Sequence, residues 1–132
     1  MRKAAGLDTS VVLRLLVGEP ESQAKRAADL MNRLHEQGRK AIVSDLVLAE
    51  TYHALQYHYE VPKAEAKAAM LDFLKSGRVL TEEESNALVC LEESTNGAGF
   101  VDRLIHSRYL DSTSEIVSFD KKMLKLDRCS SP

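Results

Sequence analysis

The feature that most constrains the fold is an alternation of short apolar segments with longer helical patterns. Four apolar segments have the length of strands, at residues 4–7, 41–43, 78–80 and 116–119. Most successive segments are separated by enough residues for at least one helix. Strands that alternate with helices pair in parallel through helical crossovers. The sequence therefore predicts an α/β fold with a short, mainly parallel central sheet and about seven helices.

Proline and glycine mark the ends of several predicted helices. Pro20 and Pro62 stand at helix starts, and three glycines follow runs of apolar residues at helical spacing: Gly18, Gly38 and Gly77. These marks predict helices over residues 10–17, 20–37 and 62–76.

Three further helices follow from local signals. Ser44 is placed to cap a helix that follows the second strand, and Thr81 with Glu84 forms a capping box that predicts a helix over 81–93. The acidic cluster at 82–84 is then a favourable start for that helix, because negative charge meets the positive end of its dipole. Another helix is expected to begin near Gly97 or Gly99.

Length and composition indicate one folded domain over residues 1–132, with 44% apolar and 29% charged residues. The net charge of −2 neither requires nor excludes a nucleic acid partner. Cys90 and Cys129 have no spacing typical of zinc or disulfide sites. No run reaches the ~18 apolar residues of a membrane span, and we expect a cytoplasmic protein.

Glu50 is the first candidate functional residue, because it is the one formally charged side chain between Leu46 and Tyr59. At about 100° per residue, Leu46 and Tyr57 fall within ~40° of it on a helix, which predicts that Glu50 projects from a mainly apolar face. A buried carboxylate requires a cation, a metal or hydrogen-bond donors. The alternative is a boundary glutamate whose head reaches water or an arginine.

Three aspartates occupy related positions. Asp8 ends the first strand, Asp120 ends the last, and Asp102 lies in the first turn of its helix. Ligands of open parallel sheets bind beyond the carboxyl ends of the strands. Each aspartate also has a structural alternative: a turn or cap for Asp8, a dipole complement for Asp102 and a helix cap for Asp120.

Convergence of these four carboxylates would require a compensating cation, because like charges raise one another's pKa. Oxygen ligands of this kind suit Mg²⁺ or Mn²⁺. Such ions activate water and stabilise a leaving oxygen at phosphorus. The combination favours metal-assisted hydrolysis of phosphate esters.

The order DTSVVLRLL, LAETYHAL, GFVDRLIHSRYL and VSFDKKM resembles the PIN-domain ribonucleases, most closely the VapC-type toxins of bacterial toxin–antitoxin pairs. The resemblance spans Asp8 to about Met123. It implies an RNA-cutting hydrolase that uses Mg²⁺ or Mn²⁺. It also implies a homodimer that a cognate antitoxin silences, with promoter DNA bound only through the antitoxin.

The resemblance carries the metal-binding and catalytic roles to four residues: Asp8, Glu50, Asp102 and Asp120. It implies secondary roles for Ser10, which helps to orient Asp8, and for Ser118. We also expect Arg14, Lys121 and Lys122 to contact phosphate or the antitoxin.

Two other classes of function compete with this prediction. One is a PIN-fold module that binds RNA or protein without significant catalysis. The other is a carboxylate-bridged di-iron protein, since Glu50 and His53 match the Glu-x-x-His unit of such sites. That architecture needs a second pair, and the sequence contains none.

Overall fold

The computed structural model describes residues 3–93 and 97–132 of the chain. It divides into two compact units, Met1–Glu83 and Glu84–Pro132, which we call the N-terminal unit and the C-terminal unit. The prediction of one domain over residues 1–132 stays a prediction. Six α-helices and one 3-10 helix occur in the described residues, which agrees with the expected number.

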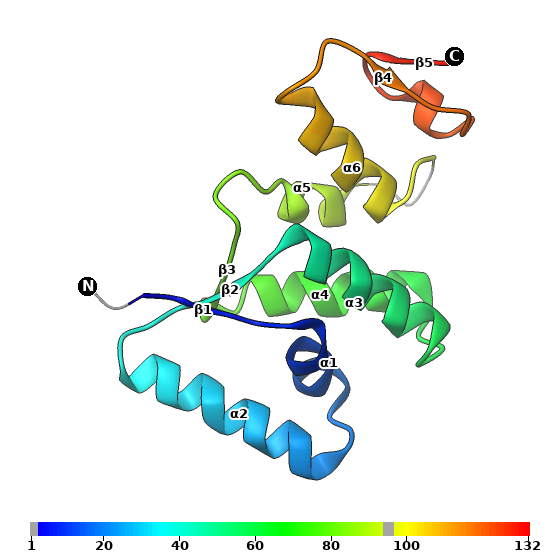
Figure 1. The fold of residues 1–132 in the computed structure, drawn as a ribbon. Helices are drawn as coiled ribbons and strands as arrows, with labels where there is room; N and C mark the ends of the chain where they lie inside the picture. Colours follow the sequence, from blue (N-terminus) through cyan, green and yellow to red (C-terminus); the bar gives the residue numbers. More distant parts are fainter. Residues whose placement is uncertain (1–2, 94–96) are drawn as a thin grey trace. The chain divides into compact units, whose positions relative to one another are not determined.

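The N-terminal unit is a three-stranded sheet with four helices (Figure 1). Its elements are β1 (Ala5–Gly6), α1 (Thr9–Val17), α2 (Glu21–Glu36), β2 (Ala41–Val43), α3 (Asp45–Tyr57), α4 (Lys63–Leu74) and β3 (Val79–Thr81). The strands lie in the order β1-β2-β3 and pair in parallel, with Ala5 opposite Ala41 and Ala41 opposite Val79. A pair of helices connects each strand to the next, which confirms the predicted α/β fold.

Helix boundaries in this unit follow the punctuation closely. Pro20 and Pro62 are N-cap residues, one position before the first helical residue. Gly18 ends α1 with φ of 80°, and its N–H donates to the Arg14 carbonyl at 3.0 Å. A side chain at this left-handed position would be strained, so glycine sets the end of α1.

The core of the N-terminal unit lies between the sheet and the helices. Val12, Val43 and Leu48 are completely buried, and Met70 on α4 is 1% exposed. Contacts join α1 with α2, α3 and α4, and α3 also packs on α4. Burial of these aliphatic side chains fixes the helices against the strands.

The start of α3 is capped twice. Ser44 Oγ accepts from the Val47 N–H at 3.1 Å, which confirms the predicted cap. Glu82, just beyond β3, accepts from the Asp45 N–H at 2.7 Å. The acidic residue therefore does favour a helix N-terminus, but the helix is α3, which precedes it in the chain.

The predicted helix over 81–93 is wrong at its beginning. Thr81 pairs with Val43 as the last residue of β3, and the helix α5 covers only Ala87–Glu92. Strand pairing of Thr81 removes the N-cap of the expected capping box, and α5 begins at Ala87, three residues after Glu84. Local sequence signals could not reveal this long-range pairing.

The C-terminal unit contains α5, α6 (Phe100–Leu110), β4 (Ile116–Val117), the 3-10 helix η1 (Met123–Lys125) and β5 (Cys129–Ser130). Phe100 and Leu104 of α6 are buried, as are Ile116 and Met123. The His106 ring lies 2.8 Å from the Asp127 carbonyl, which joins α6 to the segment before β5. Within the described ranges no helix is long and apolar enough to cross a membrane.

The strand predicted at 116–119 is shorter and pairs differently. It ends at Val117 and forms a two-stranded parallel sheet with β5, separate from the sheet of the N-terminal unit. Asp120 donates its backbone N–H to Ser118 Oγ at 3.0 Å, so the chain leaves the extended conformation before Phe119. The partner strand β5 was not predicted, because only two residues form it.

The cap from Glu82 gives a first prediction. Glu82→Ala is expected to lower the free energy of unfolding by about 1 kcal/mol, because the Asp45 N–H loses its acceptor. Urea unfolding followed by circular dichroism measures the change. Glu83→Ala, at the exposed neighbouring position, is the control. Equal losses in both variants would contradict the assignment of the cap.

A second prediction concerns Tyr52 on the buried face of α3. Burial raises the pKa of its phenol above the ordinary value of 10.0, so the folded protein favours the neutral form. This contribution to stability is complete below pH 10 and is lost as the pH rises through the raised pKa. Urea unfolding between pH 8 and 11 should show a smaller loss in Tyr52→Phe than in wild type. Tyr59→Phe is the control and should lose stability as wild type does. If Tyr52→Phe also loses as much stability as wild type over this pH range, the raised pKa of Tyr52 does not contribute.

Candidate active site

Asp8 lies at the carboxyl end of β1, where the chain enters α1. Its backbone carbonyl accepts from the N–H groups of Val11 and Val12 at 3.1 and 3.2 Å, but its side chain makes no capping bond. The carboxylate instead accepts from Ser10 Oγ at 3.0 Å through Oδ2. The cap alternative for the Asp8 side chain is therefore wrong, and the predicted contact of Ser10 with Asp8 is present.

Glu50 lies on the exposed face of α3, which corrects the expectation of a buried face. Its predicted neighbours Leu46 and Tyr57 are 72% and 78% exposed. The residues that α3 buries lie on its other side: Asp45, Leu48, Thr51, Tyr52 and Leu55. Helical spacing correctly grouped Glu50 with apolar residues, but both faces of α3 carry apolar side chains, so hydrophobicity could not show which face is buried.

Thr9 lies beside one candidate carboxylate of the N-terminal unit in the chain and hydrogen-bonds the other. Its hydroxyl donates to Glu50 Oε1 at 3.2 Å, and it stands between Asp8 and Ser10 in the chain. The contact joins the start of α1 to the middle of α3. Sequence reasoning missed Thr9, although the DTS motif places two hydroxyl groups in the first turn of α1.

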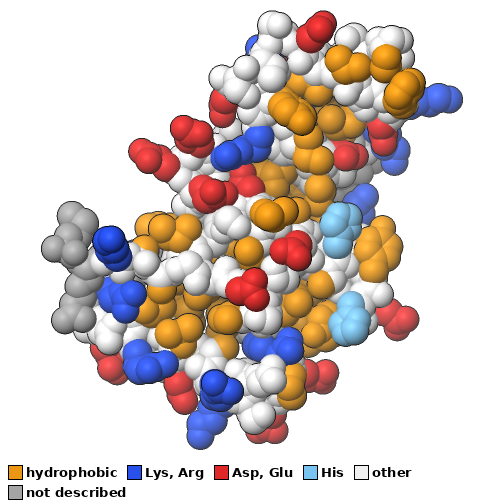
Figure 2. Space-filling model, in the orientation of Figure 1, with side chains coloured by type: hydrophobic (Ala, Val, Ile, Leu, Met, Phe, Trp, Pro, Cys, Tyr) orange, Lys and Arg blue, Asp and Glu red, His pale blue; other side chains and the backbone are white. Residues whose placement is uncertain are grey.

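His53 follows Glu50 by one turn on the same exposed face. Its ring stacks on Tyr57, with centroids 5.9 Å apart and an interplanar angle of 24°. Figure 2 shows histidines beside hydrophobic side chains over the region of α3. The contact of His53 is thus an aromatic one with the next turn of the helix.

The other two predicted acids lie in the C-terminal unit. Asp102 is half-buried in the first turn of α6. The neighbouring Arg103 donates to the Ala98 carbonyl at 2.8 Å and lies 3.7 Å from Glu93, which fixes the start of the helix. Asp102 stands where a negative charge is favourable, which agrees with its structural alternative as a dipole complement.

Asp120 caps the turn that follows β4. Its Oδ1 accepts from the backbone N–H groups of Lys122 at 2.8 Å and Met123 at 3.2 Å. The N-cap residue of η1 itself is Lys122, so Asp120 stabilises the turn that leads into this helix with one of its oxygens. A carboxylate has a second oxygen, so capping and metal coordination are compatible. Ser118 fixes the backbone of Asp120, as Ser10 holds the carboxylate of Asp8.

The predicted ligands thus divide into two pairs, Asp8 with Glu50 and Asp102 with Asp120. Each pair belongs to one unit. Across residues 3–93 and 97–132 there is no group of three or more His, Cys, Asp or Glu side chains that could hold a metal ion. Convergence of the four carboxylates stays a prediction.

The basic candidates differ in their surroundings. Arg14 on α1 donates from Nε to Gln23 Oε1 on α2 at 2.6 Å and lines a groove between these helices. Lys121 and Lys122 are exposed directly after Asp120. Their side chains are therefore accessible to a partner, whereas Arg14 is partly held by its own neighbour.

Comparison with known protein families identifies the family to which the chain belongs. The family model of the PIN domain matches residues 6–128. The chain belongs to the PIN-domain family. The match covers both units of this PIN domain and includes all four candidate acids. No curated protein matches the sequence. Membership indicates nuclease-type activity in general, with divalent metal ions as the usual cofactor.

The donors at Asp8 and Glu50 fit a hard divalent ion. Both side chains are exposed, carry carboxylate oxygens and have neighbouring hydroxyl groups from Thr9 and Ser10. Mg²⁺ typically binds one or two carboxylates and retains several waters, which needs an accessible site. The N-terminal unit of the PIN domain therefore offers suitable ligands for part of a metal site.

Thr9 provides a test of this part of the site. Thr9→Val removes the hydroxyl that holds Glu50 and is expected to weaken Mn²⁺ binding about tenfold, since loss of an outer partner costs ~10–100-fold in metal affinity. Isothermal titration with MnCl₂ measures the affinity. Thr113→Val, a loop position of the C-terminal unit, is the control. Wild-type affinity in Thr9→Val would show that Thr9 does not orient a ligand.

Proposed function

We propose that this PIN domain is a divalent-metal-dependent endoribonuclease that hydrolyses RNA phosphodiester bonds. The observation that carries the proposal is the linked arrangement at the start of α1, where Ser10 holds Asp8 and Thr9 holds Glu50. Two exposed carboxylates with fixed orientation at the carboxyl end of a parallel sheet are suited to a metal and a phosphate substrate.

Asp8, Glu50, Asp102 and Asp120 are the proposed ligands of Mg²⁺ or Mn²⁺. When bound, the metal supplies an activated water and stabilises the charge that develops on phosphate oxygens. The chain's own contribution is orientation. Ser10 and Thr9 restrict the carboxylates of Asp8 and Glu50, while Ser118 restricts the backbone of Asp120.

Positive side chains complete the proposed substrate site. Lys121 and Lys122 are placed to meet the RNA backbone beside Asp120, because they are exposed and follow it directly. Arg14 contributes from α1, four residues after Ser10. Phosphate contacts of this kind position RNA and carry no sequence information.

We further propose that the enzyme is the toxin of a toxin–antitoxin pair, acting in the cytoplasm as a homodimer. The support is the order of its four motifs, which resembles that of VapC-type toxins. Its partners would be RNA, a cognate antitoxin and, through the antitoxin, promoter DNA. Arrest of bacterial growth on expression, with relief by Asp8→Asn, tests the toxin role.

The proposed chemistry predicts RNA cleavage that depends on Mg²⁺ or Mn²⁺ and stops with EDTA. Asp8→Asn and Glu50→Gln keep the shape of each side chain but remove its charge. Loss of a residue that only hydrogen-bonds a metal ligand lowers activity by up to ~100-fold, so we expect loss of a ligand itself to reduce the cleavage rate by more than this. Gel analysis of a structured RNA measures the rate, and circular dichroism checks the fold.

The control is Glu36→Gln, which replaces an exposed carboxylate at the end of α2 by a carboxamide. Equal cleavage by wild type, Asp8→Asn and Glu50→Gln would refute the assignment of these acids. RNA binding without cleavage in wild type would favour the alternative, a binding module. Stoichiometric bound iron would favour the di-iron class.

A further inference from the structure

A groove of about 650 Å³ lies between α1 and α2. Three arginines line it, Arg14 from α1 and Arg26 and Arg33 from α2. Its apolar lining comes from Val11, Ala27 and Leu30. The groove thus combines an apolar surface with positive charge, in a chain whose net charge is −2.

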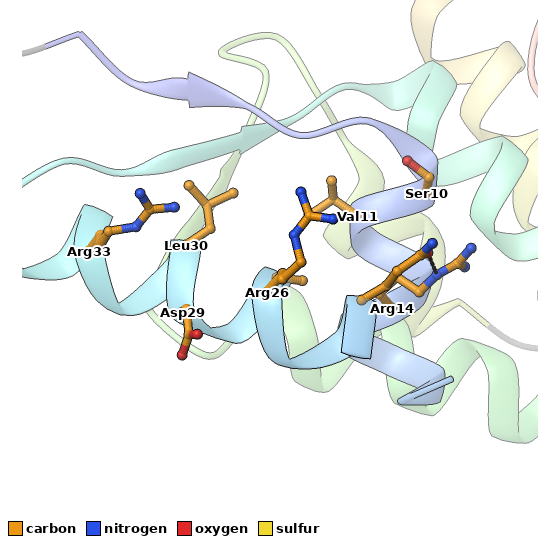
Figure 3. A pocket seen from close by; sticks show the side chains of 9 residues that line it. Ser10, Val11, Arg14, Arg26, Asp29, Leu30 and Arg33 are labelled. Atoms are coloured by element: carbon orange, nitrogen blue, oxygen red, sulfur yellow. Dashed lines mark hydrogen bonds between the residues drawn. The ribbon is translucent and has the colours of Figure 1, made fainter. Parts of the chain in front are cut away.

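Arg26 and Arg33 form a row along α2. They are seven residues apart, which places them on one face of the helix and about 10.5 Å apart along its axis. In Figure 3 their guanidinium groups and Leu30 project to the same side of α2, and Asp29 is the one acidic residue of the lining. Figure 2 shows further Lys and Arg side chains gathered over β1 and α2.

The charge of this row is not neutralised within the part of the chain that the structure describes. Arg26 and Arg33 are exposed, and neither forms an ion pair there. Arg14 donates to the neutral amide of Gln23. The groove lining thus carries three cations and one carboxylate, Asp29, so its net charge is positive, and the exposed Arg26 and Arg33 are available for a negatively charged ligand.

The groove also reaches the candidate active site. Ser10 lines one end of it, and Ser10 Oγ donates to Asp8 Oδ2 at 3.0 Å. A ligand that occupies the groove from Arg33 to Ser10 therefore ends beside a proposed metal ligand. All of these residues belong to the N-terminal unit.

We propose that the α1–α2 groove binds the sugar–phosphate backbone of single-stranded RNA and leads it to Asp8. This inference rests on the proposed ribonuclease function and adds a binding track outside the carboxylates. Arg26 and Arg33 contact phosphates by their planar guanidinium groups, which match phosphate geometry. Val11 and Leu30 receive the apolar faces of riboses or unpaired bases.

Two features favour single-stranded RNA over an acidic peptide or a duplex. A row of separated cations matches a backbone with charge at regular intervals. The apolar lining can contact unpaired bases, which a duplex keeps stacked inside its helix. An acidic peptide would find the same arginines, but nothing in its chemistry requires a groove that ends at Asp8.

The test measures binding without catalysis. A fluorescein-labelled, single-stranded RNA of twelve nucleotides is titrated with the full chain in EDTA, and anisotropy gives the dissociation constant. We expect Arg26→Gln/Arg33→Gln to weaken binding roughly tenfold, as for loss of two exposed charge contacts. The slope of log affinity against log salt should become shallower by about 1.4, or ~0.7 for each lost phosphate contact.

Lys25→Gln is the matched control for Arg26→Gln. It makes the same change of charge at the adjacent, exposed position of α2, but Lys25 does not line the groove. We expect Arg26→Gln to weaken RNA binding and Lys25→Gln to leave it within twofold of wild type. Equal effects of the two substitutions would overturn the proposal, because general electrostatics would then explain the binding.

A second arm uses a glutamate-rich amphipathic peptide of the same net charge as the RNA. If the double variant loses the peptide but retains the RNA, the groove is a protein-binding site and the proposal is wrong. If the double variant loses the RNA and a duplex of the same sequence binds more weakly than the single strand, the proposal is supported.

The outcomes also separate this proposal from the proposed function. RNA binding that depends on Arg26 and Arg33, without metal-dependent cleavage, would support the groove and refute the ribonuclease. Cleavage that depends on Asp8, with RNA affinity unaffected by the double variant, would support the ribonuclease and refute the groove.

Discussion

The parallel pairing of β1 with β2 is the constraint on which the candidate site depends. It places the carboxyl ends of both strands at one edge of the sheet, so that Asp8 after β1 lies near the start of α3 after β2. Thr9 then reaches Glu50 across 41 positions of the chain. Without this register, α1 and α3 would begin at different levels, and the hydroxyl that follows Asp8 in the chain would not reach Glu50.

Charge in the N-terminal unit is separated along α1. Its start carries Asp8 with Ser10, while Arg14 one turn later faces the arginines of α2. Acidic groups that hold a cation and basic groups that hold phosphates are complementary in a phosphodiesterase, since both surround the same substrate. Although the net charge of the chain is only −2, the start of α1 is therefore locally negative and the groove beside it is locally positive.

Local signals predicted the elements more reliably than their contacts. Prolines, glycines and Ser44 gave the helix boundaries of the N-terminal unit to within a few residues. The face of α3 was predicted wrongly, because its apolar residues surround the whole helix. The capping box at Thr81 failed because Thr81 pairs with Val43 of β2 as the last residue of β3. The spacing of apolar residues predicts that a segment is helical. Which face of the helix is buried depends on the elements that pack against it, and these are distant in the sequence.

The cap from Glu82 also has a meaning for the order in which the chain is made. Every hydrogen bond described for Asp8, Thr9 and Glu50 joins residues that precede Glu83, and the bond from the Asp45 N–H to Glu82 does so too. Synthesis proceeds from the N-terminus at about 5–20 residues per second, and compact units form as they emerge. The residues that make these hydrogen bonds have therefore all been synthesised before residues 84–132 emerge from the ribosome.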